Sequence, residues 1–291
     1  MSVDAFDFNK PPNEERERLG IALWAQTYPR IDDLETKLNG PYMLVQAGST
    51  LAVDDRFLGR WRAGGLQGGA MAASLDALLT ARMVLEAGTL PMTALYPVFR
   101  AAIENASLAI YLLSPAARDD RLVRAYGIAA DEAQKQFAFQ ASLGEDGAGA
   151  RDQILSEIRN LVEARGTLGD AEAFRPMNST HTLIVKSADE VIERDPAIAH
   201  PQRMPLVAIW QLLSGMSHAK QWALITALHR TEAIVNEQDQ TAHVKLTSGT
   251  ELVALVMYRA VEALEVALRF HGRRSKTWTA LPEDTADMTH R

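Results

Sequence analysis

The segment MTALYPVFRAAIENASLAIYLLS, residues 92–114, predicts a helix that is apolar on almost every side. A helix of this kind is stable only where neighbouring helices cover it, so we expect it at the centre of a domain. Pro115 follows it and predicts its end. The flanking segments 70–86 and 119–143 are rich in strong helix formers, and Gly88 is a stop signal after the first of them. The sequence therefore predicts a mainly α-helical protein.

Prolines, glycines and capping residues delimit the other predicted elements. A first helix is expected from Asn13 until just before Pro29, and a long loop at residues 39–70, where glycine is frequent. Further helices are expected at residues 150–165, 180–194, 206–228 and 252–270. The last of them has Ser248 as its expected N-cap. Apolar and polar residues alternate near residues 232–247, so the predicted fold class is a helical bundle with one small β-hairpin.

The predicted domain organisation has three parts. Residues 1–12 form a loose lead-in, residues 13–272 a helical domain, and residues 273–291 a polar tail. The glycine-rich stretch at 144–149 and the loop at 166–178 are the two places where the helical domain would divide if it has two lobes.

Composition excludes several kinds of chemistry. The chain of 291 residues has no cysteine, which rules out disulfides, thiolate nucleophiles and cysteine-ligated clusters. A net charge of −7 disfavours a broad surface for nucleic acid or an anionic membrane. The N-terminal residues lack the apolar region of a signal peptide, and no segment has the roughly 20 uninterrupted apolar residues of a membrane-spanning helix. We therefore expect a cytoplasmic protein without a membrane partner.

Polar residues follow one face of the central apolar helix. They are Arg100, Glu104, Ser107 and Tyr111, at spacings of four, three and four. A buried charge costs several kcal/mol unless it is paired. Arg100 and Glu104 are therefore expected to pair with each other or with a facing helix.

The segment 206–228 offers a complementary face, beside which His218 lies. That face carries Trp210, Ser214, Ser217 and Gln221. The two polar faces are expected to meet. His218 is then a candidate general acid or base, with Glu104 and Arg100 to orient it and the Ser214 hydroxyl beside it. The preferred alternative is a self-satisfied structural network that fixes the register of the helices.

A cluster of charged residues just beyond Pro115 is the second candidate site. Its cations are Arg118, Arg121 and Arg124. Guanidinium groups bind phosphates and carboxylates bidentately, so an anion is the expected ligand, although a solvated helix face is the common alternative. Tyr111 and Trp210 are candidates for the lining of a pocket or for the core. The chain lacks a P-loop and a two-histidine zinc helix, so neither a cofactor nor a metal is expected.

The segments RAAIENASLAIYLLSP and SGMSHAKQWAL resemble a group of uncharacterised all-helical actinobacterial proteins that is distantly similar to the HEPN superfamily. The resemblance implies a helical bundle, often a homodimer, and in many members a metal-independent ribonuclease. The nuclease members carry an arginine followed after four to six residues by a histidine. Two formal matches exist, Arg175 with His181 and Arg194 with His200, whereas His218 has no arginine at that distance.

Three functional hypotheses follow from these observations. The first is a non-catalytic helical binding or regulatory protein of HEPN-like architecture, and the second is a metal-independent HEPN-type ribonuclease. The third is a small-molecule enzyme that uses His218 as a general acid or base. The positions that distinguish the second from the first are those of Arg118, Arg121, Arg124, Arg194 and His200 relative to one another.

Overall fold

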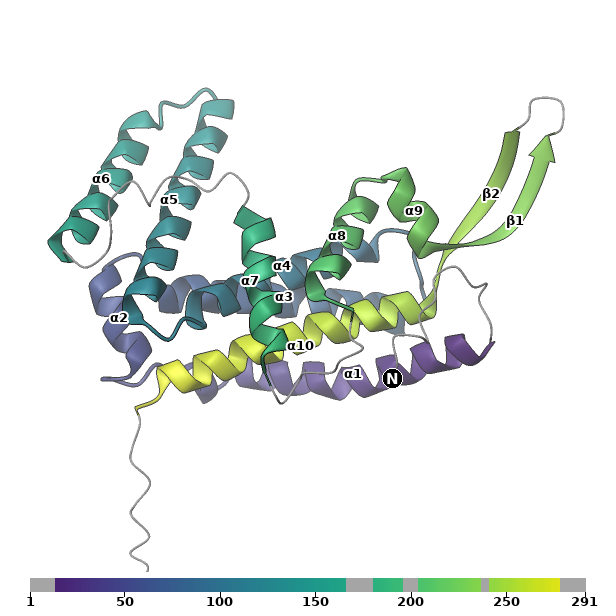
Figure 1. Cartoon of the computed structure of the whole chain (residues 1–291), viewed down its shortest axis with the longest axis horizontal. Helices are drawn as coiled ribbons and strands as arrows, with labels where there is room; N and C mark the ends of the chain where they lie inside the picture. The colour runs from purple at the N-terminus through teal and green to yellow at the C-terminus, as the bar shows by residue number, and fades with distance from the viewer. Residues whose placement is uncertain (1–13, 166–179, 196–203, 237–240, 278–291) are drawn as a thin grey trace, which may run out of the picture.

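The computed structural model describes residues 14–165, 180–195, 204–236 and 241–277 (Figure 1). Within these residues the chain forms ten α-helices, one short 3-10 helix and one two-stranded antiparallel sheet. The predicted fold class, a mainly α bundle with a small β-hairpin, is confirmed.

The helices and strands have the following bounds in chain order. They are α1 (Glu14–Leu38), η2 (Pro41–Met43), α2 (Thr50–Leu58), α3 (Ala63–Glu86), α4 (Leu95–Leu113), α5 (Arg118–Ser142), α6 (Ala148–Arg165), α7 (Thr180–Glu193), α8 (Leu206–Ser217), α9 (Gln221–Ala227), β1 (Leu228–Asn236), β2 (Thr241–Ser248) and α10 (Thr250–Ser275).

Helix α4 lies at the centre of the main core, as its apolar sequence predicts. It packs against α3, α10, α7 and α8, and α1 runs along α10 on the other side. Phe99, Ile103 and Ile110 of α4 are fully buried. A helix that contributes apolar side chains in all directions is stabilised by this surrounding layer rather than by one amphipathic face.

A second cluster of buried residues joins α2, α5 and α6 to the C-terminal end of α4. Leu58, Leu112, Tyr126 and Ile158 belong to it. Figure 1 shows α5 and α6 projecting as a helical hairpin at one end of the molecule, while β1 and β2 project at the other. The division of the domain into two lobes stays a prediction.

The predicted end of the first helix before Pro29 is wrong, because α1 continues through Pro29 to Leu38. An internal proline costs about 3 kcal/mol. Burial offsets this cost, since Thr27, Ile31 and Leu34 continue one buried stripe across the proline. A Cβ added at Gly20 would lie 2.8 Å from the backbone nitrogen of Glu251, so glycine lets α1 approach α10 closely.

The predicted long loop at residues 39–70 is also wrong, because it contains α2 and the start of α3. The Ser49 hydroxyl accepts a hydrogen bond from the Ala52 backbone nitrogen at 3.2 Å and caps α2. Asp55 accepts from the Gly64 backbone nitrogen at 3.0 Å in the first turn of α3. These local caps, together with burial of one face, outweigh the low helix propensity of the glycines in α3.

The predicted single helix over residues 206–228 is interrupted after Ser217 and resumes as α9. The Ala219 nitrogen donates to the Met216 carbonyl at 3.1 Å, and the Lys220 nitrogen donates to the Gly215 carbonyl at 2.9 Å. This pair of hydrogen bonds is the Schellman pattern that ends a helix. The chain then turns back, and the Trp222 side chain packs against Gly215.

The last helix differs from the prediction at both ends. Its N-cap is Gly249 rather than Ser248, whose hydroxyl instead hydrogen-bonds the Tyr96 hydroxyl. The helix extends to Ser275, so Arg273 and Arg274 belong to α10 and not to a polar tail. Basic residues in the last turn interact favourably with the helix dipole, which is consistent with this longer helix.

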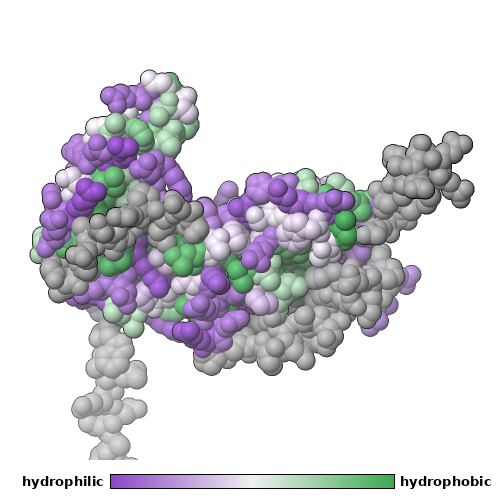
Figure 2. All heavy atoms as spheres, turned by 45° about the horizontal axis from the view of Figure 1, so that its top comes forward, coloured by the Kyte–Doolittle hydropathy of each residue, from purple (hydrophilic) through white to green (hydrophobic). Residues whose placement is uncertain are grey.

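Helix α3 is long and apolar enough, by length and composition alone, to cross a membrane, and among the described helices it is the one that meets this test. It packs against α4, α1 and α10, as a core helix does. On the described part of the face in Figure 2, hydrophilic and hydrophobic residues are intermixed.

Candidate functional site

The two predicted polar faces meet at the Glu104 carboxylate. Arg100 Nε donates to Glu104 Oε1 at 2.8 Å, and Trp210 Nε1 of α8 donates to the same oxygen at 2.8 Å. The expected pairing of Arg100 with Glu104, and the contact between α4 and α8, are therefore present. We call Arg100, Glu104, Trp210, His181 and His218 the polar seam.

Two histidines border the polar seam. His218 Nε2 lies 3.4 Å from Arg100 Nη1, and His181 Nδ1 of α7 lies 3.9 Å from Glu104 Oε2. The Arg100 and Glu104 side chains are 23% and 18% exposed, so the seam is open to solvent at one edge. His181 could not be placed in the seam from the sequence, because only the packing of α7 against α4 brings it there.

The polar seam is shorter than the predicted face. Ser107 is fully buried, and within the described residues its hydroxyl has no hydrogen-bond partner. Tyr111 belongs to the second core cluster, where burial raises its pKa. In the part of the chain that the structure describes, no hydrogen bond joins the Ser214 hydroxyl to His218. The Ser217 hydroxyl donates to the Leu213 carbonyl at 2.8 Å.

The charged cluster beyond Pro115 is organised around Asp54, which the sequence analysis did not identify. Arg121 Nε and Nη2 donate to the two oxygens of Asp54 at 2.7 and 3.2 Å, and the Arg121 and Asp54 side chains are 5% and 3% exposed. Arg118 Nε lies 3.3 Å from the same carboxylate. Arg121 and Arg118 are therefore bound within the protein and hold α5 against α2.

Arginines also surround the C-terminal end of α4. Arg124 donates to the Tyr111 carbonyl at 2.7 Å, and Arg274 donates to the Pro115 carbonyl at 2.8 Å. Carbonyl groups at a helix C-terminus carry partial negative charge, which attracts guanidinium groups. Burial, followed by the positive charge of Arg121, lowers the pKa of Arg274. Arg124 and Arg274 therefore bind carbonyl groups at and just beyond the end of α4.

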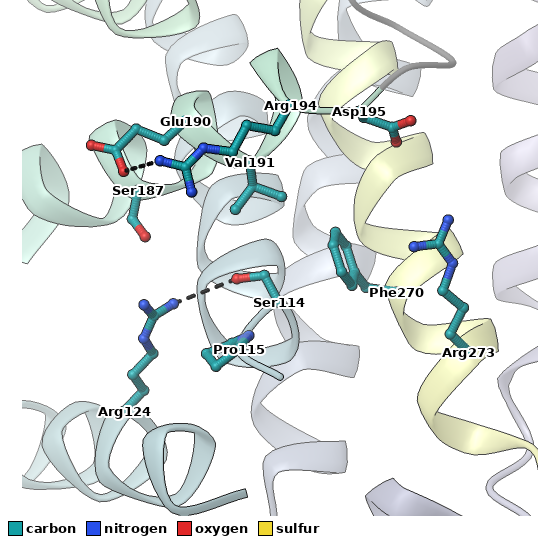
Figure 3. Close-up of a pocket in the computed structure, with 10 residues that line it drawn as sticks. All are labelled: Ser114, Pro115, Arg124, Ser187, Glu190, Val191, Arg194, Asp195, Phe270 and Arg273. Carbon is teal, nitrogen blue, oxygen red and sulfur yellow. Dashed lines mark hydrogen bonds and ion pairs between the residues drawn. The ribbon is translucent and has the colours of Figure 1, made fainter. Parts of the chain in front are cut away.

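A pocket of about 590 Å³ opens beside this end of α4 (Figure 3). We call it the arginine pocket. It is lined by Ser114, Pro115, Arg124, Ser187, Glu190, Val191, Arg194, Asp195, Phe270 and Arg273. Arg124 comes from α5, Arg194 follows α7 and Arg273 comes from α10. Three separate helical segments thus supply one guanidinium group each.

Two of these guanidinium groups are weakly engaged. Arg194 Nη2 lies 3.9 Å from Glu190 Oε2, and the Arg194 side chain is 81% exposed. The Arg273 guanidinium lies 5.5 Å from the centre of the Phe270 ring, and within the described chain it has no ion pair. Asp195, by contrast, accepts a hydrogen bond from Arg269 at 2.9 Å. Arg194 and Arg273 therefore retain donors for an external anion.

The remaining lining is apolar with two hydroxyl groups. Phe270, Val191 and Pro115 provide apolar surface, and Ser114 and Ser187 provide the hydroxyls. In Figure 3 the Phe270 ring lies between Ser114 and Arg273. A lining of this kind is suited to a ligand that carries both an oxyanion and an apolar group. Guanidinium groups bind the oxyanion, and the ring contacts the apolar group.

Sequence reasoning identified two of the pocket arginines, Arg124 and Arg194, but not Arg273 or Phe270. The predicted helix ended at residue 270 and the predicted tail began at 273, so their shared position on α10 was missed. The basic run in the last turn of α10 is the signal that would have revealed them. Arg175 and His200 lie outside the described residues.

No protein family, curated protein or solved structure matches the chain. Among the described residues, no three histidine, aspartate or glutamate side chains lie where they could hold a metal ion together. The polar seam and the arginine pocket are therefore the features from which a function can be inferred.

Proposed function

We propose that the chain is a non-catalytic helical binding protein whose ligand is a small organic anion held in the arginine pocket. The observation that carries this proposal is the placement of Arg124, Arg194 and Arg273 around one cavity. Arg194 has only an exposed, 3.9 Å pairing with Glu190, and within the described residues Arg273 has no ion pair. Guanidinium groups are suited to carboxylate and phosphate oxygens. The volume of about 590 Å³ lies in the range of small-molecule sites.

Local charge supports an anion in this pocket although the whole chain carries −7. Arg124, Arg194 and Arg273 line the pocket, whereas one of its two carboxylates, Asp195, is bound to Arg269 outside the lining. A bound anion would reduce the repulsion among the lining arginines. The Arg194 side chain is largely exposed, so added salt should weaken the interaction.

In this proposal the polar seam is structural. Glu104 Oε1 already accepts from Arg100 and Trp210, and His218 lies beside Arg100 rather than beside a hydroxyl group. The arrangement supports a network that aligns α4 with α8 better than it supports a general acid or base. The enzyme hypothesis based on His218 therefore receives less support.

The ribonuclease hypothesis also receives less support. Its discriminating observation is the relative position of Arg118, Arg121, Arg124, Arg194 and His200. Arg124 and Arg194 line one pocket, but Arg118 and Arg121 are bound to Asp54, and His200 lies outside the described residues. We keep three further expectations as proposals: HEPN-like architecture and a homodimer, both from the sequence resemblance, and a cytoplasmic location.

A thermal-shift screen with acetate, benzoate, inorganic phosphate and phenyl phosphate tests the proposal. A ligand that binds the folded state raises the melting temperature, by about 2 °C or more at concentrations well above its dissociation constant. We expect such a shift with wild type and not with the Arg194→Met/Arg273→Met variant. The Arg18→Met/Arg159→Met variant, which removes two exposed arginines elsewhere, should keep it. No shift with any of the anions would contradict the proposal.

A further inference from the structure

We infer that the ligand of the arginine pocket is a monocarboxylate that carries an aromatic ring. The inference rests on the proposed function, because it specifies the chemistry of the anion in the same pocket. Two features of the lining carry it: the balance of its charges and the position of the Phe270 ring.

The charges that line the pocket favour a single negative charge on the ligand. Three arginines and two carboxylates line the cavity, and one of these carboxylates, Asp195, is already bound to Arg269 outside the lining. Glu190 lies beside Arg194 at 3.9 Å, so a second negative charge on the ligand would meet the Glu190 carboxylate. Like charges at short range disfavour the complex. A carboxylate fits this balance better than a phosphate dianion does.

The Phe270 ring indicates an aromatic group on the ligand. The Arg273 guanidinium lies 5.5 Å from the ring centre, on the side away from Ser114 in Figure 3. The ring is also partly buried against both core clusters, which restrains its orientation. Aromatic pairs in offset or edge-to-face contact are favoured beyond their buried area. Val191 and Pro115 extend the apolar surface next to the ring.

The two features lie in one cavity, so a single ligand satisfies both. Its carboxylate would accept hydrogen bonds from Arg194 or Arg273, and its ring would contact Phe270. The hydroxyls of Ser114 and Ser187 offer further donors to the carboxylate. A volume of about 590 Å³ accommodates a ring and a short side chain without requiring a larger molecule.

Isothermal titration of the full-length protein with four probes tests the inference. The probes are 3-phenylpropionate, propionate, 3-phenylpropanamide and phenyl phosphate. We expect 3-phenylpropionate to bind at least about tenfold more tightly than propionate, which lacks the ring, and than the amide, which lacks the charge. It should also bind more tightly than phenyl phosphate.

The Phe270→Leu variant provides the matched control, because leucine keeps apolar volume but not the ring. We expect it to weaken 3-phenylpropionate about threefold to tenfold and to leave propionate unchanged. Equal affinity of propionate and 3-phenylpropionate for wild type would overturn the inference even if the variant does not fold. Tighter binding of phenyl phosphate would also overturn it. If none of the anions binds, the proposed function itself fails, so the two failures are distinguishable.

Discussion

At the residue scale, the Glu104 carboxylate connects two helices through one oxygen. Its Oε1 accepts hydrogen bonds from Arg100 on its own helix and from Trp210 on α8. Removal of such an acceptor leaves both donors without this partner in a partly buried place, and this loss costs more than the hydrogen bonds contribute net. Glu104 therefore contributes to stability through the donors that it satisfies.

Glu104→Ala should lower the free energy of unfolding by about 2 kcal/mol, because it leaves Arg100 Nε and the Trp210 indole unpaired. Urea denaturation measures the change. Glu163→Ala removes an exposed carboxylate on α6 and should change stability by less than about 0.5 kcal/mol. Equal midpoints for Glu104→Ala and wild type would show that the polar seam does not stabilise the fold.

His271 provides a second residue-scale prediction, because burial lowers its pKa from the ordinary value of 6.5. Its ring is fully buried, with Nδ1 3.0 Å from Gln67 Nε2. Below pH 6.5 the unfolded chain binds a proton that the folded chain does not. Stability should therefore be complete above pH 6.5 and fall as the pH drops through the lowered pKa, by at most about 1.4 kcal/mol per pH unit.

Unfolding free energies at pH 7.5 and pH 5.5 measure this contribution. His271→Gln has no titrating group at this position, so its loss of stability between the two pH values should be smaller than that of wild type. An identical loss in both proteins would exclude His271 as a source of the acid sensitivity.

At the element scale, the break between α8 and α9 depends on a strained residue. Ala219 has a φ of +49°, and among the described residues it is the one non-glycine residue with a positive φ. An L-residue with a Cβ pays about 1 to 2 kcal/mol for this conformation. The strain is tolerated because the Schellman hydrogen bonds and the packing of Trp222 on Gly215 both require the turn.

Ala219→Gly should therefore raise the free energy of unfolding by about 1 kcal/mol, because glycine adopts the left-handed conformation without steric cost. Thermal or urea denaturation checks this. Ala87→Gly is the matched control, since Ala87 ends α3 with a φ of −71° and should not be stabilised by glycine. A loss of stability in Ala219→Gly would contradict the assigned turn.

Helices with strong local signals could be predicted from the sequence. The places where a helix continues through a proline or breaks could not. The apolar period of residues 92–114 and the glycine at 88 specify α4 and the end of α3 locally. The passage of α1 through Pro29 depends instead on burial against α10, which no local pattern encodes. For the same reason the frequent glycines predict a loop at the start of α3, where the structure has a helical turn capped by Asp55.

At the scale of the whole molecule, the candidate sites could be predicted only where their residues share one helix. Arg100 and Glu104 are four residues apart, so helical geometry alone places them together. The arginine pocket combines α4, α5, α7 and α10, and its Arg273 lies 149 positions after Arg124. Such a site depends on tertiary packing. The sequence indicates that arginines could bind an anion, but it does not indicate which arginines share a pocket.

The most direct test of the account is the affinity of the arginine pocket for anions in wild type and in the Arg194→Met/Arg273→Met variant. Isothermal titration with 3-phenylpropionate and phenyl phosphate measures it at low ionic strength. The account predicts that at least one of these anions binds wild type, and that the variant, with an unchanged melting temperature, binds it about tenfold or more weakly. Equal affinity of the two folded proteins would contradict the assignment of the anion to this pocket.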